Sequence, residues 1–125
     1  MIIYIAAPYT SGRITENIKQ VCDIGDILLA RGHIPYIPHI NHLWDLISPK
    51  SYKTWMRIDL EILSRCDAVL RIGGKSVGAN KEVRYAEKLN IPVYYSIEEL
   101  EKGDDIKTFN SLEKLIEDLH GEELL

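Results

Sequence analysis

Residues 68–82 read AVLRIGGKSVGANKE, and this stretch decides which fold the rest of the chain can build. The apolar run 68–72 predicts a buried strand, and the small residues of 73–78 predict a loop that opens a helix. Such a unit directs backbone N–H groups at one point, which favours a phosphate or another anion. We expect Glu82 in the first turn of this helix, where the helix dipole favours an ionised carboxylate. A carboxylate that stays charged beside an anion site suits a nucleophile better than a proton donor.

Outside this stretch, apolar segments of strand length alternate with segments of helical periodicity. The expected strands are residues 2–7, 33–38, 67–72 and 93–95. The expected helices are residues 14–30, 52–66, 79–89, 97–100 and 111–120. Residues 39–51 are expected to form an irregular loop, and long loops of this kind often bind ligands.

This alternation predicts an α/β fold in which helices cover both faces of a parallel sheet. We expect one three-layer α/β/α domain over residues 1–125, Rossmann-like (flavodoxin-like), with a mostly parallel sheet of four to five strands. Ligands of such folds bind at the carboxyl ends of the strands. The loops 8–13, 39–44 and 73–78 should therefore form one rim around a site.

Composition and charge narrow the class of protein. A net charge of −4 argues against a non-specific nucleic-acid surface, which needs clustered Lys and Arg. No apolar run approaches the roughly 18 residues of a membrane span, and the apolar opening is expected to be a strand and not a signal peptide. Cys22 and Cys66 lack zinc or C-x-x-C spacing and are expected to be buried free thiols. We expect a cytoplasmic protein that binds neither nucleic acid nor membrane.

Asp59 is the sharpest anomaly among the polar residues. At 100° per residue it falls between Trp55 and Ile62 on the apolar stripe of the expected helix 52–66. A carboxylate on an inward face costs free energy unless it is paired or hydrogen-bonded. One interpretation is a structural carboxylate that caps a loop or pairs with an arginine. The other is a site carboxylate whose raised pKa suits proton transfer.

Other polar residues keep two interpretations on sequence grounds. Glu82 is equally compatible with an ordinary residue of a helix start. Tyr4 is compatible with a core tyrosine, unless its hydroxyl points at a carboxylate. Thr10 and Arg13 could reach a phosphate from the first loop, or Arg13 could be solvated.

Metal and cofactor motifs are weak in this chain. His39, His42 and Asp45 have the spacing of metal ligands but lack an evident fourth ligand. A hydrogen-bonding or base-stacking pocket, or plain loop structure, fits this loop better. Gly74-Lys75-Ser76 lacks the first glycine of a Walker A loop, because Val69 stands there, and no G-x-G-x-x-G fingerprint is present. We therefore expect no metal and no cofactor.

Several stretches taken together resemble the nucleoside 2-deoxyribosyltransferase-like superfamily, and its nucleoside 5′-monophosphate N-glycosidase branch in particular. The resemblance covers residues 2–95. The stretches are Ile3-Tyr4-Ile5-Ala6-Ala7-Pro8-Tyr9-Thr10, Asp59-Leu60-Glu61 with Asp67-Ala68-Val69, and Ser76-Val77-Gly78 with Glu82. The last of these looks like the S-x-G-x-x-x-E signature of the branch.

The resemblance implies cleavage or exchange at the N-glycosidic bond of a (deoxy)nucleoside or its 5′-monophosphate. It makes Glu82 the nucleophile at C1′ of the sugar and Tyr4 the residue that orients it. It makes Asp59 the group that assists proton transfer to the departing base and contacts the sugar. Ser76 and Gly78 would bind the 5′-phosphate. Retaining cleavage needs one ionised carboxylate and one proton-handling group, which Glu82 and Asp59 would supply.

The resemblance also implies a role in substrate binding for Asp67, with His39, Thr10 and Arg13 contributing from the loops. The first loop departs from the branch, which has Arg at the position of Thr10, while Arg13 matches a basic position there. Members generally form homodimers or larger homo-oligomers in which a neighbour completes the site, and the loop 39–51 is a candidate for that contact.

Two classes of function remain open from the sequence. The first is a hydrolase or transferase that acts through a covalent glycosyl-Glu82 intermediate. The second is a non-catalytic nucleotide-binding or sensing module of the same fold. The sequence names neither the base, the sugar, the need for a 5′-phosphate nor the acceptor.

Overall fold

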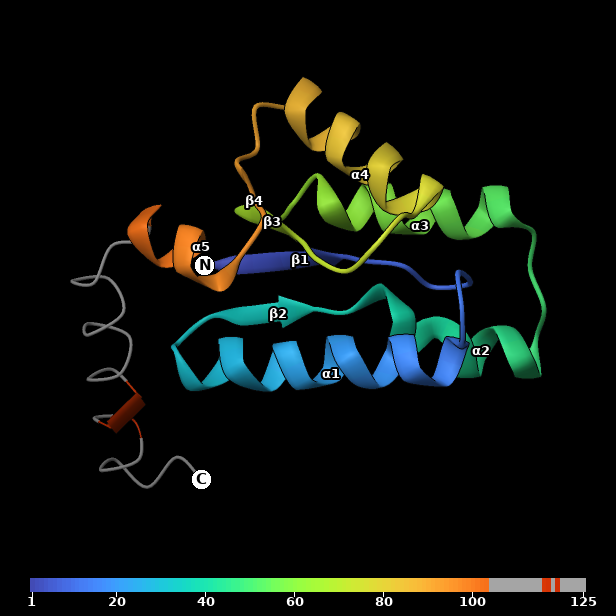
Figure 1. The fold of residues 1–125 in the computed structure, drawn as a ribbon, viewed down its shortest axis with the longest axis horizontal. Coiled ribbons are helices and arrows are strands. Elements are labelled where there is room, and N and C mark those ends of the chain that lie inside the picture. Colours follow the sequence, from blue (N-terminus) through green and yellow to red (C-terminus); the bar gives the residue numbers. More distant parts are fainter. Residues whose placement is uncertain (104–115, 118, 120–125) are drawn as a thin grey trace.

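The computed structural model describes residues 1–103, 116, 117 and 119. One parallel sheet in this part of the chain has the strand order β2-β1-β3-β4 (Figure 1). The strands are β1 (Ile2–Ala6), β2 (Ile34–Tyr36), β3 (Ala68–Arg71) and β4 (Val93–Tyr94). Tyr4 in the middle of β1 pairs with Tyr36 on one side and Val69 on the other. The predicted α/β Rossmann-like fold with a parallel sheet is confirmed.

The helices are α1 (Ile14–Ala30), η1 (Pro38–Asn41), α2 (His42–Ile47), α3 (Tyr52–Leu63), α4 (Val77–Lys88) and α5 (Ile97–Gly103). They differ from the expected boundaries mainly at the segment 39–51 and at the start of α4, while α3 ends at Leu63 and α5 at Gly103. The expected irregular loop contains two short helices, η1 and α2, because Pro38 starts the first one and six residues are too few to show helical periodicity. The expected helix 111–120 lies outside the described residues except at 116, 117 and 119.

The start of α4 is the second correction. Ser76 caps the helix, and its hydroxyl accepts a hydrogen bond from the Ala79 N–H at 3.1 Å. The helix therefore begins at Val77, two residues before the expected start. Glu82 consequently lies in the second turn, where the backbone dipole acts on it less than expected.

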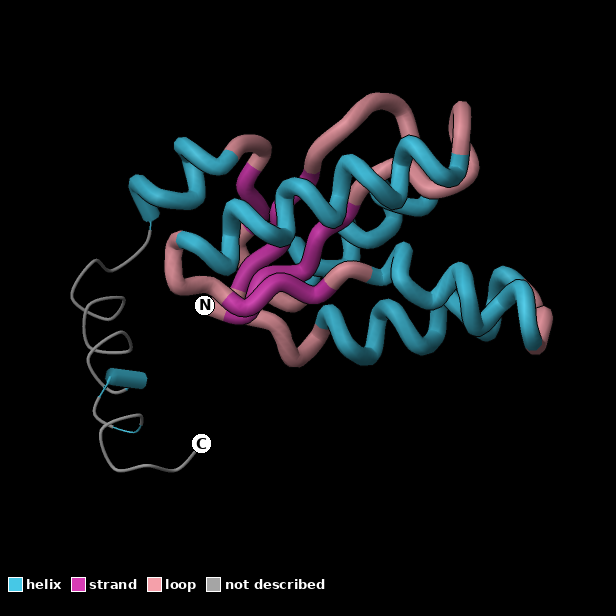
Figure 2. Tube along the Cα trace, turned by 90° about the horizontal axis from the view of Figure 1, so that it is seen from below, coloured by secondary structure: helices cyan, strands magenta, loops and turns pink. Residues whose placement is uncertain are grey.

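Helices cover both faces of the sheet (Figures 1 and 2). Side chains of β1 alternate between these two faces. Ile3 and Ile5 pack with Leu28 of α1 and Leu100 of α5. Tyr4 and Ala6 point to the other face, where they pack with residues of α3 and α4. We call these the α1 face and the α4 face.

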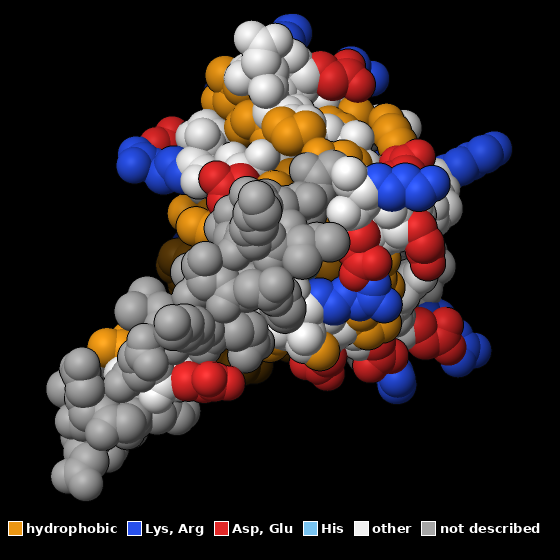
Figure 3. All heavy atoms as spheres, turned by 90° about the vertical axis from the view of Figure 1, so that its left-hand side faces the viewer, with side chains coloured by type: hydrophobic (Ala, Val, Ile, Leu, Met, Phe, Trp, Pro, Cys, Tyr) orange, Lys and Arg blue, Asp and Glu red, His pale blue; other side chains and the backbone are white. Residues whose placement is uncertain are grey.

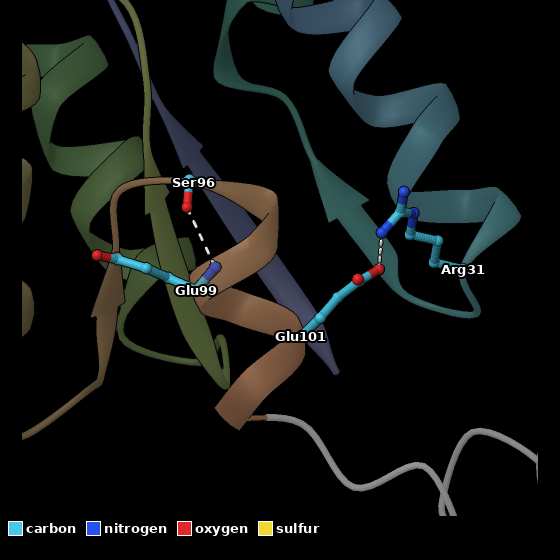
Figure 4. Close-up of polar contacts among 4 residues, drawn as sticks. All are labelled: Arg31, Ser96, Glu99 and Glu101. Carbon is cyan, nitrogen blue, oxygen red and sulfur yellow. Dashed lines mark hydrogen bonds and ion pairs between the residues drawn. The ribbon is translucent and has the colours of Figure 1, made fainter.

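Two polar contacts involve α5, one at its own start and one with the residue that follows α1 (Figure 4). The Ser96 hydroxyl accepts a hydrogen bond from the Glu99 N–H at 3.1 Å, which caps the helix. Arg31, which follows α1, forms an ion pair with Glu101 of α5.

Acidic and basic side chains are intermixed on the end of the molecule shown in Figure 3. None of the helices described is both long enough and apolar enough to cross a membrane.

Candidate active site

A cavity of ≈ 660 Å³ lies where the loops after β1, β2 and β3 meet α2, α3 and α4. Its position at the carboxyl ends of the strands is the one that the fold favours for ligands. Five of the predicted side chains and one predicted glycine line it: Thr10, His39, Asp59, Ser76, Gly78 and Glu82. The three loops thus contribute to one rim, as predicted from the order of elements.

The loops after β1 and β3 touch where this cavity ends. Gly73 has a φ of +80°, and a Cβ there would lie only 2.6 Å from Cδ of Pro8. A side chain at this position would therefore be strained in its backbone and would clash with the proline ring. The contact brings the end of β1 close to the loop that carries Ser76.

Glu82 and Tyr4 form the buried centre of the site. Glu82 is 7% exposed and Tyr4 is fully buried. The Tyr4 hydroxyl donates a hydrogen bond to Oε2 of Glu82. Tyr4 comes from the middle of β1 and Glu82 from α4. The hydrogen bond therefore ties the carboxyl group of Glu82 to a strand of the sheet.

The protonation of Glu82 differs from the expectation. Burial raises its pKa to about 8, and the negative charge of Asp59 acts in the same direction. The Tyr4 hydrogen bond and the positive charge of Arg71 oppose this rise without cancelling it. The expected stabilisation of the carboxylate by the helix dipole is outweighed, because Glu82 is one turn further into a buried part of α4.

Asp59 lies on α3 and also lines the cavity. Burial raises its pKa to about 6. Its Oδ1 is buried and has no hydrogen-bond partner in the described part of the chain. The ion pairs and hydrogen bonds found among these residues do not link Asp59 to Arg57 or Arg71; Arg71 instead donates to Gly74 O at 2.7 Å. The interpretation of Asp59 as a structural carboxylate that pairs with an arginine is therefore not supported by these contacts.

Both carboxyl groups thus titrate above their usual range, and the negative charge of Asp59 contributes to the raised pKa of Glu82. Such a pair holds one proton between its two apparent pKa values, here from about 6 to about 8. Near neutral pH the site contains one negative charge and one transferable proton. This combination can supply a nucleophile and an acid in the same reaction.

An aromatic wall formed by Tyr9, His39 and His42 closes another side of the cavity. The Tyr9 ring meets each histidine ring edge-on, with centroids 5.6 Å apart. The Tyr9 hydroxyl also contacts Nδ1 of His42. Asp45, the third residue of the considered metal set, accepts hydrogen bonds from Trp55 Nε1 at 2.6 Å and from the Lys50 N–H at 3.0 Å. Within the described residues, no three His, Cys, Asp or Glu side chains gather as metal ligands.

The sequence interpretation missed the two cations that line the cavity, Lys50 and Lys81. Lys50 Nζ lies 4.7 Å from the Trp44 ring centroid, and Lys81 Nζ lies 5.2 Å from that of Tyr52. Lys81 could have been found, because it follows Gly78 by three positions and therefore shares its helix face. Lys50 follows α2 and has no comparable signal.

Three predicted residues lie outside the cavity lining: Tyr4, which reaches the site through Glu82, and Arg13 and Asp67. Arg13 precedes α1, is exposed, and pairs with Glu16 at 3.4 Å. Asp67 precedes β3 at the amino end of the sheet, where its Oδ2 accepts a hydrogen bond from the Ile2 N–H at 2.7 Å. The expected substrate contact of Asp67 is therefore corrected, because the cavity lies at the opposite ends of the strands.

Comparisons with known proteins agree with this architecture. A family described as a domain of unknown function (DUF7768) matches residues 1–96. No curated protein is similar enough in sequence to match the chain. A solved 2-deoxyribosyltransferase from the psychrotolerant bacterium Bacillus psychrosaccharolyticus has a TM-score of 0.62 at 19% identity, over 87% of this chain and 96% of that one. A 2-desoxiribosyltransferase from Leishmania mexicana has a TM-score of 0.57 at 18% identity, over 74% of this chain and 61% of that one.

These structural likenesses, at identities below one fifth, show a shared fold. The shared fold is the one that the predicted resemblance to the deoxyribosyltransferase-like superfamily implies. The assignment to the 5′-monophosphate N-glycosidase branch stays a prediction.

Proposed function

This chain belongs to the DUF7768 family, and we propose that it cleaves the N-glycosidic bond of a (2′-deoxy)nucleoside or its 5′-monophosphate. The observation that carries the proposal is the pair of Glu82, which is buried, and Asp59, which is half-buried, in one cavity, with Tyr4 hydrogen-bonded to Glu82. The fold shared with 2-deoxyribosyltransferases supports the same class of chemistry.

In the proposed reaction, the single proton of the pair, which the higher pKa of Glu82 keeps mainly on that residue, first moves to Asp59, so that the reacting form carries its negative charge on Glu82. The Glu82 carboxylate attacks C1′ of the sugar while the bond from C1′ to the base nitrogen breaks. The electron pair of that bond leaves with the base, and Asp59 gives its proton to the base. A glycosyl ester of Glu82 remains. Water or the nitrogen of a second base then attacks C1′, which frees the Glu82 carboxylate and returns a proton to Asp59.

The buried surroundings supply what this reaction requires. Tyr4 holds one carboxyl oxygen of Glu82 and favours its ionised form, which the low-polarity environment otherwise disfavours. Asp59 has no competing partner for Oδ1, so its carboxyl group is free to face the substrate. The proton is thereby kept within the pair and away from bulk water.

We place the sugar and its 5′ end at the start of α4. Ser76 and Gly78 line the cavity there, and Lys81 adds a positive charge on the same helix face. Thr10 faces the same cavity from the first loop. This arrangement supports a phosphorylated substrate. In it Lys81 takes the phosphate-binding role that the sequence had suggested for Arg13.

We further propose that a second copy of the chain covers the outer side of η1 and α2. Five large apolar side chains of η1 and α2 are exposed: Ile40, Leu43, Trp44, Leu46 and Ile47. The expected oligomer would bury this surface. Light scattering after gel filtration should give at least a dimer for the native chain and a monomer for Leu43→Asp, whereas a monomeric native chain would contradict the proposal.

The free thiols Cys22 and Cys66 suit the expected cytoplasmic compartment.

The test is a panel of nucleosides and 5′-monophosphates, incubated with and without a second free base and separated by chromatography. We expect free or exchanged base from at least one substrate, and none with Glu82→Gln. Glu61→Gln is the matched control, because Glu61 is an exposed acid on α3 that pairs with Arg65. Ligand-induced stabilisation without base release across the whole panel would favour the nucleotide-binding module instead.

A further inference from the structure

His39 is held in one tautomer by its surroundings. It is 5% exposed, and its Nε2 lies 2.9 Å from the Pro8 carbonyl oxygen. A carbonyl oxygen only accepts hydrogen bonds, so Nε2 carries the proton and Nδ1 is a bare acceptor. Burial lowers the pKa of the ring, which keeps it neutral, although the carbonyl groups of Pro8 and Ala7 partly offset this effect.

The acceptor at Nδ1 is buried and has no partner among the described residues. Oδ1 of Asp59, in the same cavity, is the other side-chain atom found in this condition. Buried polar atoms of native proteins are nearly always hydrogen-bonded, so two orphan acceptors on one cavity indicate a ligand that brings donors. Water can also donate to these two atoms, but because it donates to any acceptor it gives no selectivity between ligands.

We propose that Nδ1 of His39 accepts a hydrogen bond from an N–H group on the edge of the substrate base, and that it thereby selects bases with a donor there. The proposal rests on the proposed function, which it deepens by assigning the base end of the cavity. A site built around a buried acceptor rejects ligands that leave it unpaired.

The position of His39 favours the base over the sugar as the donor. Glu82 must face C1′, and the start of α4 beside it carries Ser76, Gly78 and Lys81 for the 5′ end of the sugar. His39 comes from η1, after β2, and belongs to the aromatic wall with Tyr9 and His42. Flat rings of this kind offer an apolar surface to a planar base. Asp59 is then left for the base nitrogen that receives the proton.

Two substitutions separate the two nitrogen atoms of His39. In His39→Asn, the amide oxygen can take the place of Nδ1, so the acceptor is kept and the Pro8 contact is lost. In His39→Gln, the amide nitrogen can take the place of Nε2, so the Pro8 contact is kept and the acceptor is lost. The pair therefore distinguishes ligand selection from simple support of the loop.

The experiment compares matched bases: adenine with purine, and cytosine with pyrimidin-2-one, as free bases and as deoxyribonucleosides. Thermal shift measures binding, and initial rates measure kcat/KM. We expect the native chain and His39→Asn to prefer the amino-bearing base of at least one pair by about 10- to 100-fold. We expect this preference to fall below about threefold in His39→Gln, mostly through KM. A 2′,3′-dideoxynucleoside of the preferred base should respond to His39→Gln as its parent does.

The outcomes separate this proposal from the proposed function. Equal binding of amino-bearing and amino-free bases by the native chain would overturn the role of His39, whether or not base is released. Loss of preference in His39→Asn but not in His39→Gln would also overturn it, because loop support would then be the cause. Selective binding without turnover would leave His39 assigned and would contradict only the catalytic function. A dideoxynucleoside insensitive to His39→Gln would move the donor to the sugar and contradict the assignment to the base.

Discussion

The two faces of one sheet differ sharply in what they bury. On the α1 face, Ile3 and Ile5 of β1 pack against Leu28 and Leu70, and all four are fully buried. On the α4 face, the neighbouring residue Tyr4 meets Glu82, with Asp59 close enough to affect the pKa of both. Apolar burial stabilises the fold, whereas two buried carboxyl groups oppose it. The two carboxyl groups gathered on the α4 face are therefore evidence of a site and not of a structural need.

The largest expected effect comes from removing the proton donor of the α4 face. Asp59→Asn should lower kcat/KM by about 10²- to 10⁴-fold, the usual contribution of general acid catalysis. The native profile should be bell-shaped, with limbs near pH 6 and pH 8, because only the singly protonated pair reacts. The alkaline limb should disappear in the variant, since no proton on Asp59 remains to be lost. An unchanged bell in Asp59→Asn would exclude Asp59 as the acid.

A substitution on the α1 face should change stability without changing the chemistry. Ile5→Ala should lower the free energy of unfolding by about 2–5 kcal/mol, because a fully buried side chain leaves a cavity. Urea denaturation measures this change. The limbs of the pH profile should stay in place, because Ile5 packs in the cluster of the α1 face, whereas Glu82 and Asp59 lie on the α4 side of the sheet. Shifted limbs would show that the two faces are not independent.

Glu82→Gln should flatten the pH dependence of stability. The folded pKa of Glu82, about 8, exceeds the ordinary value of 4.5, so the folded state holds this proton more tightly than the unfolded chain. The stability of the native chain should therefore fall as the pH rises from about 4.5 to about 8, and this fall should be missing in the variant. The contribution of Glu82 to the difference in unfolding free energy between pH 5 and pH 9 should be on the order of 4 kcal/mol. Parallel curves would mean that Glu82 has an ordinary pKa.

The smallest effect is expected from Tyr4→Phe, which keeps the buried ring and removes the hydroxyl. Its hydrogen bond lowers the pKa of Glu82, so its loss should raise that pKa and reduce activity at neutral pH by about tenfold. Tyr36→Phe is the control, because the Tyr36 ring lies 5.6 Å from the Tyr4 ring in the same layer. A larger loss in the control than in Tyr4→Phe would contradict the orienting role.

The fold was largely predictable because each element carries its own periodicity. The strands around Tyr4 and Val69 show uninterrupted apolar runs, and Gly32 marks the end of α1. The segment at η1 and α2 was not predictable, because its exposed apolar side chains give no pattern of burial.

The site was predictable where chemistry shows in a local pattern. Asp59 interrupts an apolar stripe, and Glu82 follows a small-residue loop, so both were found. A raised pKa of Asp59 was one of the two interpretations of the sequence, whereas the raised pKa of Glu82 was not expected, because its burial depends on how α3 and α4 pack across the sheet. The place of Asp67 could have been predicted, since a residue before a strand lies at the amino end of a parallel sheet, away from the ligand.

The central claim is a glycosyl ester on Glu82, and trapping this intermediate tests it most directly. A substrate with fluorine at C2′ should slow breakdown of the ester, because fluorine disfavours the oxocarbenium-like transition state. After incubation and an acid quench, peptide mass mapping should show one added fluorinated glycosyl group on the peptide that contains Glu82, and none in Glu82→Gln. Base release from the native chain with the adduct on another residue, or with base release undiminished in Glu82→Gln, would contradict the account.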